Sequence, residues 1–100
     1  MAAIDVGSNS IHITVARVTD AAVRVLAAQK RSARLGSALT RHGVLSEETI
    51  AMVVDILNDY RSLAEAHGAE IRASATAALR SARNAHEVIE RIRVGAGIEV

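Results

Sequence analysis

The stretch Asp5-Val6-Gly7-Ser8-Asn9-Ser10 decides how the rest of the chain is interpreted. Residues 2–4 before it form a short apolar run. Residues 10–18 after it alternate apolar and other side chains with the two-residue period of a half-buried strand. A tight turn between strands directs backbone N–H groups and short side-chain donors at one point, where a phosphate could bind, with the carboxylate near a metal or water. The same residue types also form ordinary hairpin turns, so the turn alone leaves both interpretations open.

The composition limits the class of protein. One hundred residues make at most one small domain, and Tyr60 is the single aromatic residue, so the core must consist of Ile, Val, Leu and Ala. A chain of this length buries only about two-thirds of its unfolded surface, so we expect marginal stability and a piece of a larger protein. Scattered arginines without aromatic partners disfavour nucleic-acid binding.

Other features point to a cytoplasmic protein. The chain has no cysteine, which excludes a disulfide scaffold and a thiolate metal site. No apolar run reaches membrane-spanning length, and no charged leader with an apolar segment begins the sequence, so we expect no membrane partner. The four histidines are scattered without ligand spacing, which disfavours a histidine metal site.

The first half of the chain is predicted to contain three strands. They cover residues 2–6, 10–18 and 23–33, and their short connections imply an antiparallel meander. Residues 34–45 have the composition of a loop, because four breaking or polar residues interrupt them (Gly36, Ser37, Thr40 and Gly43).

The second half alternates helices and strands. An amphipathic helix of about twenty residues follows Ser46, a good N-cap, and ends at His67-Gly68. Residues 70–75 are predicted to form a strand parallel to one of the first three, and residues 76–83 a helix. Asn84, with Glu87 three residues on, predicts a capping box for a further helix that stops near residues 95–97. Residues 98–100 are predicted to begin another strand.

Two further segments are candidate sites. Thr76 and Arg80 lie where the strand over 70–75 passes into a helix, a place where free N–H groups can bind an anion. The alternative is that Thr76 only caps the helix and that Arg80 is a solvated surface arginine. Arg34, in Arg34-Leu35-Gly36-Ser37 after the third strand, is a possible cleft residue or a surface arginine of a loop.

Together these segments resemble a known family. Residues 3–12 resemble the opening motif of the exopolyphosphatase/guanosine pentaphosphate phosphohydrolase (Ppx/GppA) family, a branch of the actin-like ATPase superfamily. Arg34-Leu35-Gly36, residues 45–48 and residues 75–84 resemble later segments of the family in the right order, although Ala38 stands where the family usually has glycine. The resemblance implies an α/β fold, the first part of a ribonuclease-H-like lobe. It would hold three antiparallel strands, a helix, a parallel strand, a helix and an incomplete strand, with residues 1–100 as the N-terminal part of one domain.

The resemblance also implies a function and a site. The family hydrolyses the terminal phosphoanhydride of inorganic polyphosphate or guanosine pentaphosphate with Mg²⁺. Asp5 would lie near the metal. Phosphate would be bound by residues of the turn and of the later segment (Gly7, Ser8, Asn9, Ser10, Thr76 and Arg80).

The resemblance leaves alternatives open. The family's catalytic glutamate is expected beyond residue 100, since Glu99 lies inside the expected last strand, so we expect this chain alone to bind without hydrolysing. It would then be an inactive phosphate- or nucleotide-binding fragment of a working enzyme. The resemblance implies that the full-length enzyme is a homodimer, as is common in this family. A sugar-kinase relative is a further alternative, against which the Gly7-Ser8-Asn9-Ser10 turn argues.

Overall fold

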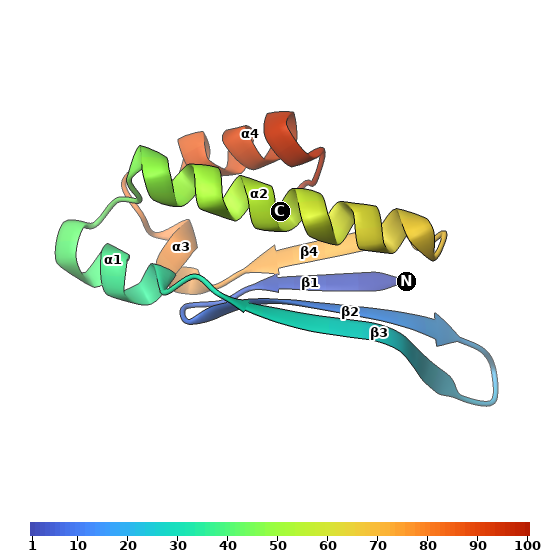
Figure 1. Cartoon of the computed structure of the whole chain (residues 1–100). Helices are drawn as coiled ribbons and strands as arrows, with labels where there is room; N and C mark the ends of the chain where they lie inside the picture. Colours follow the sequence, from blue (N-terminus) through green and yellow to red (C-terminus); the bar gives the residue numbers. More distant parts are fainter.

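A mixed four-stranded sheet, with its two longest helices on one face, makes up this chain (Figure 1). The structure, a computed structural model, describes all residues 1–100. Strand β2 is antiparallel to both β1 and β3, while β4 is parallel to β1, and the order across the sheet is β3-β2-β1-β4. The predicted meander, crossover helix and parallel strand are therefore confirmed. The elements in chain order are β1 (Ala2–Val6), β2 (Ser10–Val18), β3 (Val23–Ser32), α1 (Leu35–His42), α2 (Glu47–Ala66), β4 (Ile71–Ala75), α3 (Ala77–Arg80) and α4 (Ala85–Ala96).

One face of the sheet forms the core with α2. Buried and exposed residues alternate along β1 and most of β2, so that Ile4 and Ile13 point to the same covered face. Helix α2 lies across this face and α4 packs on α2, whereas no helix covers the opposite face (Figure 1). Tyr60 of α2 is fully buried, and its hydroxyl donates a hydrogen bond of 2.6 Å to the carbonyl oxygen of Ile11. This bond ties the helix directly to the central part of the sheet.

The predicted ends of α2 are confirmed. The Ser46 hydroxyl accepts from the Thr49 backbone N–H at 3.2 Å, which satisfies one of the free donors of the first turn. Glu47 and Glu48 add negative charge to that turn, where the helix dipole favours it. Gly68, with φ of 62°, lets the chain leave the helix in the left-handed conformation that side chains disfavour.

The prediction of a loop over residues 34–45 was wrong, because eight of these residues form α1. Leu35 is buried and Leu39, one turn later, is half-buried against the core, which gives the helix one apolar face. The helix therefore tolerates Gly36, although glycine indicated a break. Gly43 ends the helix with φ of 69°.

The helix predicted over 76–83 is shorter than expected. Helix α3 contains only Ala77–Arg80, and a turn leads from it to α4. The capping box predicted for Asn84 and Glu87 is also wrong, because the Asn84 side chain makes no cap hydrogen bond. Its amide accepts from the backbone N–H of Leu45 at 3.2 Å and donates to the Leu45 carbonyl at 2.9 Å. Asn84 therefore joins two distant segments instead of capping its own helix.

Residues 98–100 form no strand, in contrast to the prediction. The chain passes Gly97 in the left-handed conformation, and Ile98 then enters the core with 2% of its surface exposed. No neighbouring strand pairs with this segment, so its apolar residues contribute to packing rather than to the sheet.

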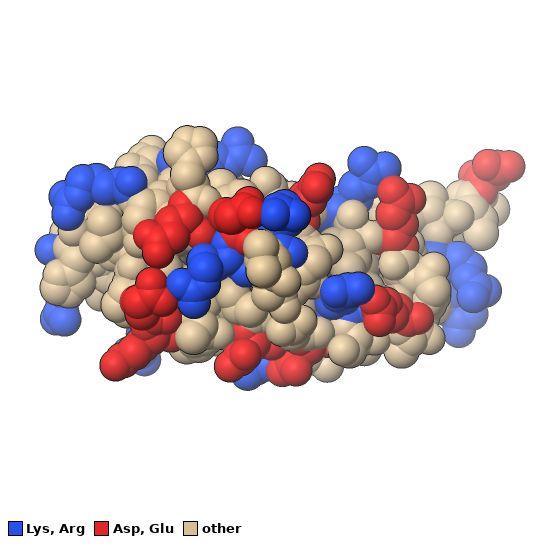
Figure 2. Space-filling model, turned by 90° about the horizontal axis from the view of Figure 1, so that it is seen from above, with Lys and Arg blue, Asp and Glu red and all other residues tan.

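Charged residues are interspersed over the helical face of the molecule. Seen from above, acidic and basic atoms alternate along α2 and α4, but the outermost atoms at the α1 end are basic (Figure 2). Arg91 of α4 pairs with Glu47 of α2 at 2.7 Å, and this pair holds the pKa of the Glu47 carboxyl below its usual value. Glu90 pairs with Arg93 in the same helix. No helix in the structure combines the length and apolar character needed to cross a bilayer.

The buried hydroxyl of Tyr60 leads to a first prediction. Tyr60→Phe removes the hydrogen bond to Ile11, and we expect it to lower the free energy of unfolding by about 1 kcal/mol at pH 7, measured by urea denaturation. Burial raises the pKa of Tyr60, so the contribution of its hydroxyl is present below the unfolded pKa of about 10 and is lost as pH rises through the folded value. The difference in the free energy of unfolding between wild type and Tyr60→Phe should therefore become smaller above pH 10. Met52→Leu, at a half-exposed position of α2, is the control and should stay near wild type. Equal stability of Tyr60→Phe and wild type at both pH values would contradict this role.

Candidate functional site

The opening turn is a hairpin of unusual shape. The backbone N–H of Gly7 donates to the Ser10 carbonyl at 3.0 Å, which leaves Ser8 and Asn9 as the two loop residues. Two-residue hairpin loops normally use positive φ values, but Arg34 is the only non-glycine residue of the chain with positive φ. A Cβ on Gly7 would lie 2.8 Å from the Ser10 carbonyl oxygen, so only glycine fits here. The turn therefore needs support from outside itself.

That support comes from the segment between β3 and α1. The backbone N–H groups of Ala33 and Arg34 both donate to the Asn9 carbonyl, at 2.9 and 3.0 Å. The Gly36 N–H donates to the Ser8 carbonyl at 2.8 Å. The two carbonyls of the loop are thus held by three donors that lie more than twenty residues further along the chain.

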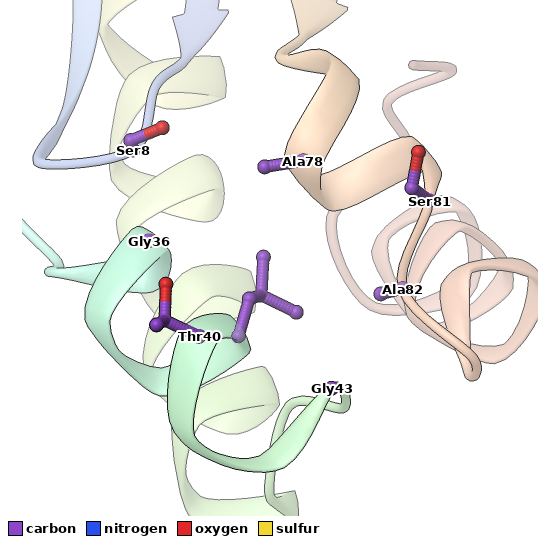
Figure 3. Close-up of a pocket in the computed structure, with 8 residues that line it drawn as sticks. Ser8, Gly36, Thr40, Gly43, Ala78, Ser81 and Ala82 are labelled. Carbon is purple, nitrogen blue, oxygen red and sulfur yellow. The ribbon is translucent and has the colours of Figure 1, made fainter.

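This arrangement leaves donors of the turn available. Neither the Ser8 nor the Asn9 backbone N–H donates to an acceptor within the chain. Asn9 is exposed, Ser8 is half-buried, and its hydroxyl points from the hairpin toward α3 (Figure 3). Successive free N–H groups in a held turn form an anion-binding concavity, so the geometry fits a phosphate oxygen.

Helix α3 begins beside this turn. Because β1 and β4 are parallel neighbours, their carboxyl ends meet at the same edge, and the Thr76 N–H donates to the Val6 carbonyl at 3.2 Å. The Thr76 side chain caps α3 by accepting from the Leu79 N–H at 3.5 Å, so the capping alternative considered for this residue is part of its role. Arg80, at the last position of α3, is exposed and makes no ion pair.

A cavity of about 420 Å³ separates the turn and α1 from α3 (Figure 3). Of the six predicted phosphate-binding residues, only Ser8 lines it. The other three residues of the turn lie outside its lining, and so do Thr76 and Arg80 in the adjacent α3 segment (Gly7, Asn9 and Ser10 are the turn residues). No acidic side chain lines it, so nothing there repels an anion. Its lining combines small and hydroxyl residues from three segments with one larger apolar residue, Leu39 (the full set is Ser8, Gly36, Leu39, Thr40, Gly43, Ala78, Ser81 and Ala82).

Sequence reasoning missed the wall that α1 provides. Gly36, Thr40 and Gly43 follow one another at the four- and three-residue steps of one helix face, and all three line the cavity. This spacing was the available signal, but it has meaning only if residues 35–42 are helical. Ser81 was missed for a different reason, since it lies in the turn after α3, where a longer helix was predicted.

Asp5, the predicted metal ligand, lies on the face of the sheet that no helix covers. In the strand register it is flanked by His12 on β2 and Ser74 on β4, and these residues line a separate hollow of about 320 Å³ with Arg72. No group of three or more His, Cys, Asp or Glu side chains in the chain could hold a metal ion. One carboxylate still suits Mg²⁺, which takes most of its ligands from water and substrate phosphates.

Arg34, the possible cleft residue, does not line the cavity beside the turn. It precedes α1 in the left-handed conformation, with φ of 51° and ψ of 40°, and its side chain lies on the opposite side of the helix, in another hollow. Its contribution to the turn is made by its backbone N–H.

Comparisons with known proteins place this chain in one family. The model of the Ppx/GppA phosphatase family matches residues 14–100. The guanosine-5'-triphosphate,3'-diphosphate pyrophosphatase of Vibrio cholerae is 41% identical over 91 residues, which cover 90% of this chain and 18% of that protein. A putative exopolyphosphatase of Haemophilus influenzae is 40% identical over 57 residues, 57% of this chain and 18% of that protein.

Two solved structures extend the likeness to the opening turn, since each covers 99% of this chain. A Ppx/GppA family member of Aquifex aeolicus has a TM-score of 0.92 at 33% identity, over 33% of its own length. An exopolyphosphatase from Cytophaga hutchinsonii has a TM-score of 0.91 at 27% identity, over 32% of its length. The chain thus spans about a fifth of the length of the curated relatives and a third of the solved ones.

The steric limit at Gly7 yields a second prediction. Gly7→Ala places a Cβ 2.8 Å from the Ser10 carbonyl, and we expect the backbone shift this forces to destabilise the chain by about 1–3 kcal/mol, measured by urea denaturation. Ser32→Ala, at the exposed strand position opposite Ser10, is the matched control and should stay within about 0.5 kcal/mol of wild type. A Gly7→Ala protein as stable as wild type would show that the turn does not need the close approach.

Proposed function

Because this chain belongs to the Ppx/GppA phosphatase family, we propose that it forms the phosphate-holding wall of a phosphoanhydride hydrolase. The observation that carries the proposal is the supported turn, in which the N–H groups of Ser8 and Asn9 have no acceptor and the Ser8 hydroxyl faces the cavity. Arg80, at the last position of α3, makes no ion pair, so its guanidinium is available to a ligand.

The proposed substrate carries a terminal phosphate on a chain of phosphates. The relatives are named for guanosine-5'-triphosphate,3'-diphosphate and for polyphosphate, and either compound presents such a terminus. The cavity suits this end of the substrate, because it offers hydroxyl groups and no carboxylate. We therefore propose hydrolysis of the terminal phosphoanhydride of inorganic polyphosphate or guanosine pentaphosphate.

In this reaction the residues of the chain bind and orient. Phosphoryl transfer places the attacking and leaving oxygens in line, and catalysis comes mainly from positioning and from charge stabilisation on the equatorial oxygens. The free N–H groups of Ser8 and Asn9 would donate to those oxygens. Arg80 would add positive charge at the same edge of the sheet. Since no carboxylate lines the cavity, we propose that the base that activates water comes from outside residues 1–100.

We further propose Mg²⁺ as the cofactor, with Asp5 as its single ligand from this chain. When bound, the ion would neutralise phosphate oxygens. Asp5 lies on β1 two residues before Gly7, at the carboxyl end of the strand that leads into the turn. We propose a cytoplasmic location, with which the absence of cysteine is consistent. We also propose that the full-length protein is a homodimer, as its family membership suggests.

Two other functions would give different results. A chain that only binds phosphate or nucleotide would hold ligand at the turn and never release product. A sugar-kinase relative would transfer phosphate from ATP to a sugar. The supported hydroxyl-rich turn favours the family reaction over sugar phosphorylation.

A third prediction concerns binding. We expect titration of the ¹⁵N-labelled chain with inorganic phosphate to shift the amide resonances of Ser8 and Asn9, whose N–H groups are available. Arg80→Gln should weaken this binding by about tenfold or more, because a hydrogen bond to a charged group contributes about 1.5–3 kcal/mol. Arg17→Gln, which removes the same charge at an exposed position of β2, is the control and should bind like wild type. Unmoved Ser8 and Asn9 resonances at saturating phosphate would refute the proposal.

The metal is tested in the same titration with Mn²⁺ as a paramagnetic substitute for Mg²⁺. We expect resonances around Asp5 to broaden only when phosphate is present, because the ion takes ligands from both. Asp5→Asn should abolish the broadening and leave phosphate binding in place. Broadening that persists in Asp5→Asn would assign the metal to other residues.

A fourth prediction separates binding from hydrolysis. Incubated with polyphosphate and Mg²⁺, the purified chain is expected to release no phosphate, since the cavity holds no carboxylate to activate water. Phosphate release that Ser8→Ala removes would instead mean that residues 1–100 suffice for catalysis. Transfer of phosphate from ATP to glucose by the chain would favour the sugar-kinase alternative.

A further inference from the structure

A second cavity lies on the other side of α1. It has a volume of about 290 Å³, and its lining includes no acidic residue. The residues Gly36, Leu39, Thr40 and Gly43 of the α1 segment face the first cavity, whereas the intervening residues of the segment face this one. The lining brings together three cationic or cation-capable side chains and three hydroxyls (Arg34, Ser37, Ala38, Arg41, His42, Val44, Ser46 and Thr49).

The two arginines of this cavity have no carboxylate partner. The five ion pairs of the chain involve Arg31, Arg61, Arg72, Arg91 and Arg93, and none involves Arg34 or Arg41. The guanidinium groups of Arg34 and Arg41 also donate no hydrogen bond to any other group in the chain. Their donors are therefore available to an external ligand.

The ordinary explanation for cations at the end of a helix does not account for this cluster. Cations in the last turn of a helix stabilise its free carbonyls, and Arg41 and His42 occupy that turn of α1. The carbonyl of His42, however, already accepts from the Arg83 guanidinium at 2.9 Å. Arg34 lies at the opposite end of α1, where the dipole disfavours a cation.

Arg34 also sits in a conformation that is costly for its residue type. It is the only non-glycine residue of the chain with positive φ, a state that costs roughly 1–2 kcal/mol for an L-residue with a long side chain. Glycine or asparagine would adopt this conformation more readily. The contact with the turn explains why residue 34 adopts the left-handed conformation. It does not explain why this residue is an arginine.

The first turn of α2 adds to the positive character of the cavity. Ser46 and Thr49 from this turn line it, at the positive end of the dipole of a twenty-residue helix. Glu47, in the same turn, is engaged by Arg91 of α4 and does not line the cavity, and neither does Glu48. The groups that face the cavity are thus cationic, cation-capable or neutral.

We propose that this cavity is a second anion-binding site, which takes a chain of two or three linked phosphates. Two guanidinium groups can each make paired hydrogen bonds to phosphate oxygens. The hydroxyls of Ser37 and Thr49 supply further donors, whereas the Ser46 hydroxyl already donates to Thr49 Oγ1. No Phe, Tyr or Trp lines the cavity, and its two guanidinium groups favour phosphate oxygens, so we take the phosphate chain itself as its ligand. This site does not depend on the turn of Ser8 and Asn9, although both favour the same ligand chemistry.

The test is a residue-resolved titration of the ¹⁵N-labelled chain with inorganic tripolyphosphate at 150 mM NaCl. Shifts of the amides of Arg34, Ser37, Arg41 and Thr49 support the second site, whereas shifts confined to the turn overturn it and leave the proposed function intact. Shifts confined to the second site support that site and count against phosphate binding at the turn of Ser8 and Asn9. GTP is the second probe, and shifts of the second site with GTP alone would also overturn the proposal, because they would require contacts to the base.

A charge-matched pair of variants completes the test. Arg34→Asn/Arg41→Gln removes both guanidinium groups, and asparagine preserves the left-handed conformation at residue 34. We expect it to weaken tripolyphosphate binding at the second site by about tenfold, which corresponds to about 1.4 kcal/mol. Arg17→Gln/Arg24→Gln removes the same charge from the exposed end of the β2–β3 hairpin and should bind like wild type. Equal weakening of tripolyphosphate binding in both double variants would show that the effect comes from net charge alone, and it would overturn the proposed site.

Discussion

Three backbone hydrogen bonds from residues 33–36 to the carbonyls of Ser8 and Asn9 are the interaction on which the site depends. A two-residue hairpin loop without positive φ values does not match the twist of its strands, so it needs external partners. The segment after β3 provides them, and the unfavourable conformation of Arg34 accompanies this contact. The same bonds engage the loop carbonyls and leave the loop N–H groups for a ligand. One contact thus determines both the shape and the chemistry of the turn.

The sheet places the second part of the site beside the first. Helix α2 carries the chain across one face of the sheet, from the β3 edge to the β4 edge. Strand β4 then pairs parallel to β1. Parallel pairing brings the two carboxyl ends to one edge, so the turn after β1 and the start of α3 lie together. The buried hydrogen bond from Tyr60 to Ile11 fixes α2 to the strand that leaves the turn. The support of the site is therefore continuous with the core.

Helix α1 organises the space around the turn. One of its faces lines the cavity that contains Ser8, and the other presents Arg34 and Arg41 to a separate cavity. Membership of the Ppx/GppA phosphatase family gives the first cavity its proposed substrate. The unpaired arginines are the basis for the ligand of similar chemistry proposed for the second cavity. A short helix that sequence patterns did not indicate is thus the element that both cavities share.

Local sequence patterns were sufficient to predict the four strands of the sheet, the limits of α2, the parallel direction of β4 and the opening turn, because these depend on local periodicity, capping residues and glycine stops. The motif of residues 5–10 and the segment at residues 75–80 were sufficient to indicate the family. Tertiary packing makes residues 35–42 helical, since the packing of Leu35 and Leu39 on the core outweighs the break that Gly36 suggests. It also decided that Asn84 binds Leu45 rather than its own helix, and that Asp5 and Ser8 lie at different hollows. These outcomes depend on partners that are distant in the chain, which no local pattern specifies.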